Sequence, residues 1–447
     1  MKIHITSFSI ADLAKGKRGF LAAIASVLFT GVFAQSGTNS PYSQFGLGTL
    51  AEQASGFNRG MNGLALGFHD GNQVNYLNPA SYARLDSITF LFDVGMSGQI
   101  TNFSENGTKR NIKQANFEYV VTGFRLAHRL GMSFGILPYS NVGYDYSTTG
   151  YVNNRNSVIY TNTYSGSGGL HQAYAGLGWS PIKNFSIGVN AGYLWGTISR
   201  SIQNSYSDNY ANTLSKSYNA EVRSYNISAG LQYDLKLSKT DLLTIGLTYG
   251  LGHKIGGKPT CRVISTNTQT AVSDSLVLGG SNIKLSIPHT FGAGFTYNHA
   301  NKLRVGADYT LQKWSKVSFP EYVSTSGNTA GYLLNDNYFK DRHKMTIGGE
   351  YCPNPSGRNL LSRIRYRTGI SYATPYIKVN GKNGPNEISG SLGFGIPIIN
   401  SYNNRSFLNI SAQIAHSSAN GMISENIFRI NLGITFNEKW FQKWKVE

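Results

Sequence analysis

The chain has 447 residues, of which only 14% are charged, while glycine (51), tyrosine (28) and phenylalanine (23) are abundant. Its formal charge of +18 would suit a nucleic-acid partner, but the basic residues are spread along the chain instead of clustering on one helix. We therefore expect no nucleic acid to bind. Lipid phosphates at a membrane surface are a simpler counter-charge for this balance.

The N-terminus has the parts of a secretory signal peptide, which we assign to residues 1–34. A basic stretch from Lys15 to Arg18 is followed by the apolar run Gly19–Ala34, and small residues precede Gln35. A membrane anchor is the alternative, but the run is short for a spanning helix. We expect export, and because no later apolar run reaches about 18 residues, any membrane would be crossed by strands.

The next segment lacks regular periodicity, and the chain changes character after it. Arg59–Asp86 is rich in small residues and contains the tripeptide Asn78-Pro79-Ala80. Ala51–Phe68 could hold a helical turn or two. We predict that residues 35–86 form an N-terminal plug, or hatch, inside the structure built by the remainder.

From about Ser87 to Phe436 the sequence is a series of alternating strands and turns. The clearest two-residue repeat lies in Phe185–Arg200, where apolar residues fall on one face and small or polar residues on the other. We predict about fourteen strands. They are Ser87–Phe103, Gln114–His128, Gly131–Tyr146, Leu170–Ser180, Phe185–Arg200, Asn219–Leu235, Leu243–Gly252, Ile287–Tyr297, Leu303–Trp314, Arg342–Tyr351, Arg363–Ile377, Ile388–Ile396, Ser406–His416 and Asn426–Phe436.

An even number of strands with alternating short and long connections is typical of outer-membrane barrels. Lipid offers no partner for an unpaired N–H or C=O group, so the sheet is expected to close. We predict an all-β, antiparallel transmembrane barrel over residues 87–436, with the short turns and the start of the plug on the periplasmic side. The expected outer loops include Ser147–Gly169, Ser201–Ser217, Gly256–Lys284 and Lys316–Asn337. A soluble sandwich or propeller is the alternative, but no blade-length repeat is present.

Several local patterns resemble the FadL family of outer-membrane transporters for long-chain fatty acids and aromatic hydrocarbons. They occur in NQVNYLNPASYARL, VGADYTLQKWSKV, IPHTFGAGFTY and RYRTGISYATPYI, and so extend over essentially the whole mature chain. The matching residues are Asn78, Pro79 and Ala80 of the hatch motif and Asp308, Trp314 and Ser315 of a later strand. The resemblance implies a plugged lumen and a kinked third strand, past which an apolar ligand leaves sideways.

The predicted third strand contains a proline. Pro138 cannot donate to the hydrogen-bond ladder, and Gly135 and Gly143 would ease a bend around it. We predict a lateral opening here. A tolerated bulge near the barrel rim explains Pro138 equally well.

Charged residues alternate with apolar ones in three later strands. Because an arginine facing lipid at mid-depth costs about 2–4 kcal/mol, we expect these charges to face the lumen. They are Arg304, Asp308, Arg342, Lys344, Glu350, Arg363, Arg365 and Arg367. We interpret them as a network that holds the plug, since buried charges need partners. The alternative is that one arginine receives a ligand carboxylate.

The tail, residues 437–447, places Trp440, Phe441 and Trp444 among lysines. We interpret it as a periplasmic anchor at the membrane interface, with a docking tail for a partner as the alternative. Cys261 and Cys352 fall near opposite ends of the barrel and are expected to be unpaired.

Nothing in the sequence indicates catalysis. There is no HExxH spacing, no serine elbow in a strand–turn–helix context and no phosphate-binding loop, so we predict neither an enzyme nor a metal or cofactor site. The favoured hypothesis is uptake of small hydrophobic, fatty-acid-like compounds through a barrel surrounded by outer-membrane lipid and lipopolysaccharide. The alternative is an accessory or shuttle subunit that joins other outer-membrane proteins in secretion or barrel assembly. A passive polar pore is the third possibility.

Overall fold

The computed structural model describes most of the chain after the predicted signal peptide. The described residues are 38–438 without 106, 153–154, 268, 271, 280–283, 325–329, 380 and 400–404. The predictions for residues 1–34 and for Trp440, Phe441 and Trp444 therefore lie outside the described residues. Within these limits, no helix is long and apolar enough to cross a membrane.

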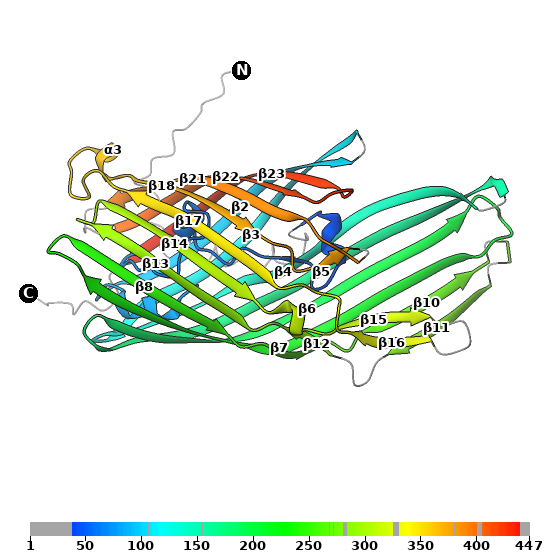
Figure 1. Ribbon diagram of the computed structural model, residues 1–447, viewed down its shortest axis with the longest axis horizontal. Helices are drawn as coiled ribbons and strands as arrows, with labels where there is room; N and C mark the ends of the chain where they lie inside the picture. The colour runs from blue at the N-terminus through cyan, green and yellow to red at the C-terminus, as the bar shows by residue number, and fades with distance from the viewer. Residues whose placement is uncertain are drawn as a thin grey trace, which may run out of the picture. The chain divides into compact units, whose positions relative to one another are not determined.

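Fourteen strands of the described chain close into one antiparallel barrel (Figure 1). Each pairs with the next in the series, and the last, β23, pairs with β2 in the register Phe92↔Phe436. The predicted fold class is thereby confirmed. The barrel strands are β2 (Phe90–Glu105), β3 (Thr108–Ala127), β4 (Leu130–Val152), β5 (Arg155–Ile182), β6 (Phe185–Tyr206), β7 (Thr213–Lys236), β8 (Asp241–Gly250), β13 (Thr290–His299), β14 (Leu303–Gln312), β17 (Arg342–Tyr351), β18 (Arg365–Ala373), β21 (Asn386–Ile399), β22 (Arg405–Ser418) and β23 (Ser424–Glu438).

Strand β6 shows how the two-residue repeat builds the wall. Val189 and Tyr193 are 50% and 52% exposed on the outside, whereas Ser186 and Asn190 are buried on the inside. Successive side chains of a strand point to opposite faces, so one face can be apolar toward lipid while the other is small or polar toward the interior.

The two ends of the barrel differ in their connections. The end that carries the tight turns after β3, β5 and β13 is called the turn end here, and the opposite end the loop end. Connections at both ends depart from the expected alternation. At the loop end, the β2–β3 connection spans only residues 106–107 and the β22–β23 connection only residues 419–423. At the turn end, the connection between β17 and β18 contains the helix α3 (Leu360–Arg363).

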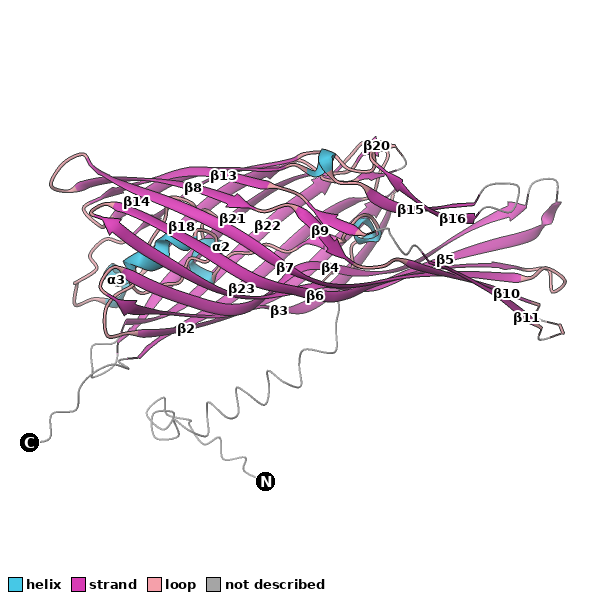
Figure 2. Ribbon diagram, turned by 90° about the horizontal axis from the view of Figure 1, so that it is seen from below, coloured by secondary structure: helices cyan, strands magenta, loops and turns pink. Residues whose placement is uncertain are grey.

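Much of what we predicted as long outer loops is strand. Strands β4 to β7 continue well past the barrel, and β10 (Thr260–Thr266) and β11 (Ser273–Gly279) extend the same sheet from β7 (Figure 2). β5 alone has 28 residues, against the 9–11 that cross a membrane. The loop prediction was wrong because it weighed polarity alone, whereas the Thr, Tyr, Val and Ile of these segments favour strands. We call this extension the projecting sheet.

Shorter elements complete the loop end and the connections. Strands β9 and β12 pair with each other, β15 pairs with β16, and β19 pairs with β20. Their bounds and those of one turn of 3₁₀ helix are β9 (His253–Gly256), β12 (Leu285–Ile287), β15 (Phe319–Ser324), β16 (Ala330–Asn335), β19 (Lys378–Val379), β20 (Lys382–Asn383) and η4 (Trp314–Lys316).

Residues 38–86 lie inside the barrel, where they contact strands on all sides. Asn62 donates to Ser371 and Ser389, the amide of Ala65 donates to Asp308, and Asn78 donates to the carbonyl of Leu231. The segment contains only short elements, as expected from its poor periodicity. They are η2 (Pro41–Gln44), β1 (Thr49–Leu50), α2 (Gly56–Arg59) and η3 (Pro79–Arg84).

The described plug runs from the loop end to the turn end. Ser40 donates to Glu425 and the Tyr42 hydroxyl to the carbonyl of Ile423, both at the loop end of the β22–β23 hairpin. Asp86 then leads into β2 at the turn end. The described part of the plug thus begins at the opposite end from the periplasmic one that we expected.

Gly168 provides a test of how the strands leave the barrel. Its φ is +103°, and an added Cβ would lie 2.0 Å from the Thr197 carbonyl oxygen on β6. Gly168→Ala should therefore lower the free energy of unfolding by about 2 kcal/mol or more, measured by denaturant titration in detergent. Gly98→Ala is the matched control, because an added Cβ there meets nothing within 4 Å. Equal stability of the two variants would contradict this account.

Candidate functional site

The turn end of the lumen holds a buried cluster of charges that joins the plug to the wall. The Asp70 carboxylate of the plug lies 2.6 Å from Arg365 and 3.0 Å from Arg304. Glu350 lies 2.7 Å from Arg367. We call these five residues the charge clamp; all but Asp70 were predicted from the sequence as inward-facing.

The register of three neighbouring strands brings the clamp together. Arg304 on β14 is opposite Glu350 on β17, which is opposite Arg367 on β18. Burial alone would raise the pKa of Asp70, but the charges of Arg365 and Arg304 outweigh it and hold that pKa well below its ordinary value. The carboxylate therefore stays ionised, and removing one partner would leave a buried charge uncompensated, which typically costs about 3–5 kcal/mol.

A second set of charges holds the first half of the plug. Arg59 of α2 is almost fully buried and lies 2.8 Å from Glu118 on β3. Glu52 lies 3.7 Å from both Lys344 and Arg429. Of these residues only Lys344 was predicted. A lone acid on the inward face of a strand, such as Glu118, was the signal that could have revealed the others.

The remaining predicted charges have different positions. Asp308 belongs to neither set of charges; its Oδ2 accepts the backbone N–H groups of Ala65 and Leu66, at 2.7 and 2.9 Å. Arg342 starts β17 at the loop end, far along the strand from Glu350. Our placement of Arg363 on a strand was wrong: it is the last residue of α3, because the turn-end connection folds into a helical turn before β18 begins.

The tripeptide Asn78-Pro79-Ala80 starts η3 and packs directly on the wall. The Asn78 side chain accepts from the Ala80 amide and donates to the carbonyl of Leu66, and Pro79 takes the first position of the helix. Glycines make room for it: a Cβ at Gly188 would lie 2.3 Å from Pro79. The motif is thus a rigid corner of the plug that only a glycine-lined wall accommodates.

The wall itself is interrupted beside β4. Pairing between β3 and β4 extends only to Val120↔Ile136, so the loop-end half of β3 pairs with β2 alone. Pro138 lies two residues past this point, and the register of β4 with β5 shifts by one residue between Pro138 and Ser140, as in a β-bulge. Pro138 is therefore inside strand β4, beside an irregularity in its pairing. Gly135 lies in the paired half of β4 and Gly143 in the half that has left β3.

A short strand of the plug occupies the exposed edge of β4. Strand β1 pairs with it in the register Thr49↔Asn141 and Leu50↔Ser140, and the Ala51 amide donates to the Tyr139 carbonyl at 3.0 Å. Nearer the loop end, the Ser43 hydroxyl donates to the Gly143 carbonyl and accepts from the Gly143 amide, each at 3.1 Å. The plug thereby satisfies backbone groups that the interruption exposes.

The residues just before β1 fill an apolar cluster at the loop end of the lumen. Leu47 is buried against a group that includes Trp314, Phe339 and Tyr376, with Phe45 packed beside it. The ring of Trp314 lies 4.6 Å from that of Tyr376, and the Tyr376 hydroxyl donates to the Gly48 carbonyl. We call Phe45–Leu50 the strap.

The other family-motif residues lie close to this cluster. Trp314 and Ser315 follow β14 in η4, and the Ser315 amide donates to Asp341 at 2.9 Å.

Cys261 and Cys352 are each buried, and neither forms a disulfide. In the described part of the chain, no group of three or more His, Cys, Asp or Glu side chains is placed to hold a metal ion.

Glu52 makes the hold on the plug sensitive to acid. Burial would raise its pKa, but Lys344, Arg59 and Arg429 lower it from 4.5 to about 2. A carboxyl group with a depressed pKa stabilises the folded state above its unfolded pKa, and this contribution is lost as the pH falls from about 4.5 to about 2. The wild-type protein should therefore lose up to about 3 kcal/mol more of its free energy of unfolding than Glu52→Gln as the pH falls through this window. Denaturant titration at each pH measures this difference. Asp274→Asn on the exposed strand β11 is the control, and an unchanged pH profile for Glu52→Gln would contradict the assignment.

Comparison with solved structures shows that transporters and channels share this fold. A Pseudomonas aeruginosa FadL homologue matches with a TM-score of 0.59 and 14% identity, over 87% of this chain and 99% of that one. The CymD monoaromatic hydrocarbon channel gives 0.58 and 14%, over 89% and 100%, and the Pseudomonas putida toluene transporter TodX gives 0.57 and 15%, over 89% and 99%. The FadL-like fold inferred from the sequence is thereby confirmed.

No curated protein matches the sequence. A family model does, over almost the whole chain: the model of the BamG family matches residues 17–447. With its fourteen-stranded barrel and FadL-like fold, this chain belongs to the BamG family.

Proposed function

We propose that the barrel carries a small hydrophobic compound from its loop-end lumen sideways into the outer membrane, through the interruption between β3 and β4. The observation that supports this most directly is the end of β3–β4 pairing at Ile136, followed by Pro138. Lipid leaves an unpaired strand edge without hydrogen-bond partners, so an interruption at membrane depth needs a compensating structure or a function.

The strap is the element that must move for a compound to pass. It covers the exposed edge of β4 with only two strand residues, and its Leu47 occupies the apolar cluster beside that edge. A hydrophobic compound would replace Leu47 and Phe45 among the aromatic side chains of the cluster, and its displacement of the strap would uncover the opening. The charge clamp holds the remainder of the plug in place during this exchange.

The chemistry of the cluster sets the class of compound. Trp314, Phe339 and Tyr376 offer aromatic faces, and the Arg200 guanidinium lies 5.9 Å from the Phe319 ring of the same cluster. This lining suits an aromatic or aliphatic molecule, with or without a carboxylate. The similar barrels CymD and TodX are described as channels for monoaromatic hydrocarbons and for toluene. We extend this class to the present chain as a proposal, with fatty-acid-like compounds included.

A disulfide between the strap and β4 tests this function. Leu50 and Ser140 are cross-strand partners, so Leu50→Cys with Ser140→Cys should lock the strap under oxidising conditions. We expect uptake of radiolabelled toluene and oleate by cells that carry the oxidised variant to fall at least tenfold, and to recover after reduction.

The control joins two strands where the wall is continuous. Thr368→Cys with Leu392→Cys links partners of β18 and β21 on the outer face and should leave uptake unchanged. If the strap lock leaves uptake at the wild-type rate, or if cells without the protein take up both compounds equally fast, the transport proposal fails.

A second candidate function is that of an accessory subunit in a larger outer-membrane machine. The projecting sheet favours it, because strands of 22 to 28 residues are far longer than transport across a membrane requires. The close packing of Leu47 in the apolar cluster is also what a permanently closed barrel would show.

Mild extraction and native mass spectrometry decide on this second candidate. If the projecting sheet docks a partner, the protein should leave the membrane in a stable complex. Replacing residues 262–277 of β10 and β11 by a short Gly-Ser turn should then release the partner while the barrel keeps its heat-modifiable migration. Recovery of the intact protein only as a monomer would exclude a stable subunit role.

A further inference from the structure

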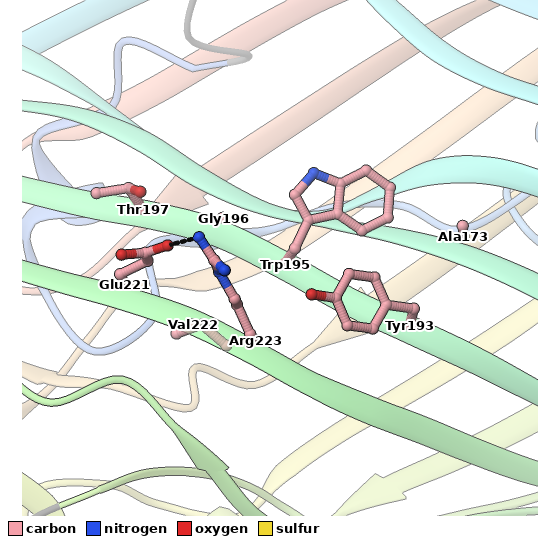
Figure 3. A pocket seen from close by; sticks show the side chains of 8 residues that line it. All are labelled: Ala173, Tyr193, Trp195, Gly196, Thr197, Glu221, Val222 and Arg223. Carbon is pink, nitrogen blue, oxygen red and sulfur yellow. Dashed lines mark ion pairs between the residues drawn. The ribbon is translucent and has the colours of Figure 1, made fainter.

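The outer wall carries a hollow that no part of the proposed transport uses. It has a volume of about 500 Å³ and is lined by three adjacent strands, β5, β6 and β7. The residues around it are Ala173, Tyr193, Trp195, Gly196, Thr197, Glu221, Val222 and Arg223 (Figure 3). This volume lies within the range of typical small-ligand sites.

The hollow faces the membrane rather than the lumen. Trp195 is opposite Arg223 in the register of β6 and β7, and it shares its face with Tyr193, which is half exposed. Leu194, which precedes Trp195 in the chain, points inward and is fully buried in the apolar cluster of the lumen. Side chains of alternate residues point to opposite faces, so Trp195 and Arg223 both lie on the outside of the barrel.

From the residues on the outer face, we infer that the hollow lies at the level where the membrane ends. Along the outer face of β6 the sequence is apolar up to Trp195 and continues as Thr197, Ser199 and Ser201. Rings paired on the same side of the wall mark this level: Tyr225 stacks on His253 with centroids 4.0 Å apart, and Tyr193 stacks on Trp195 at 5.8 Å. Aromatic side chains gather where apolar lipid meets the polar headgroups.

Three glycines shape the wall at this point. Gly168, Gly169 and Gly196 all have positive φ, and a Cβ at Gly196 would lie 2.1 Å from the Gly169 carbonyl oxygen. Strands β5 and β6 thus bend closely together where they pass from the barrel into the projecting sheet. Trp195 is partly exposed on the outside of this bend.

The hollow is lined by one acidic and one basic side chain, whose charges cancel. Arg223 and Glu221 form an ion pair of 2.5 Å on β7, and their side chains remain 73% and 61% exposed. Figure 3 shows this pair beside the rings of Trp195 and Tyr193. A phosphate near Arg223 would meet the Glu221 carboxylate, whereas a hydroxyl group can donate to the carboxylate and accept from the guanidinium.

An aromatic platform next to an acid, a base and the Thr197 hydroxyl suits a sugar. The C–H groups on one face of a pyranose pack on an indole ring, and its hydroxyls bond to the polar groups at the edge. Between the hollow and the turn end, the outer wall carries exposed Val189, Leu177 and Ile227. The acyl chains of a bound lipid would pack against these side chains. We propose that this hollow binds the sugar headgroup of a membrane glycolipid, with one ring on Trp195 and its hydroxyls on Glu221 and Arg223.

The test compares two lipids with identical acyl chains. Monoglucosyl diacylglycerol and phosphatidylglycerol are titrated separately against the barrel in detergent, and bound lipid is counted by native mass spectrometry. We expect one glucolipid to bind at least tenfold more tightly than phosphatidylglycerol. Trp195→Ala and Glu221→Gln should each weaken glucolipid binding at least fivefold, while Trp195→Phe keeps most of it.

The controls separate this site from general lipid coating and from free sugar. Tyr372→Ala removes an exposed aromatic on β18 and should leave binding unchanged. Heat-modifiable migration of every variant shows that the barrel is folded. Equal affinity for the two lipids, a preference for phosphatidylglycerol, no effect of Trp195→Ala, or equally tight binding of methyl glucoside without acyl chains would each overturn the proposal.

Discussion

The structure depends on one constraint: at membrane depth, a backbone N–H or C=O group has no partner except another part of the protein. Fourteen strands meet it by closing on each other, from β2 through β23 and back. The loop-end half of the β3–β4 seam does not meet it in this way. There the plug supplies partners for part of the β4 edge that β3 has left, because β1 pairs with Asn141 and Ser140. The interruption between β3 and β4 and the first part of the plug therefore form one structural unit.

The plug is held by two kinds of interaction that differ in strength. Asp70 at the turn end and Arg59 near the middle of the barrel are buried ions with charged partners on the wall, so displacing them would expose uncompensated charges on both sides. At the loop end, the strap is held by a two-residue strand, by apolar contacts of Leu47, and by hydrogen bonds from Tyr376 and Arg200 to the carbonyls of Gly48 and Gly46. A hydrophobic molecule can replace apolar contacts with its own, but it cannot replace a carboxylate between two arginines. In the proposed transport, this difference assigns the movement to the strap and leaves the remainder of the plug in place.

The projecting sheet and the interruption between β3 and β4 lie on the same side of the barrel. Strand β4 belongs to both, since its edge faces the interruption while its outer half runs on into the sheet with β5. Transport and a subunit role thus make different demands on one strand: transport needs the strap to leave β4, and docking needs a rigid sheet beyond the membrane. The glycines at the bend between them, with Gly168 and Gly196 at positive φ, allow the two parts of each strand to follow different directions.

The sequence alone determined the fold class, the number of strands and the inward face of the wall. The reason is that a two-residue repeat with apolar residues on one side is typical of strands with one face toward lipid and the other toward the lumen. It also predicted Arg304, Glu350, Arg365 and Arg367 as inward charges, since arginine facing lipid is costly. It missed Asp70 and Glu52, because an irregular plug has no periodicity from which to place a side chain. It also missed Glu118, although this acid lies on the inward face of strand β3. Polar strands were mistaken for loops for a related reason: a sheet with water on both faces shows no apolar alternation. Only the tertiary structure decided which charges meet, that β3 leaves β4 after Ile136, and that the strap takes its place, because these depend on contacts between residues far apart in the chain.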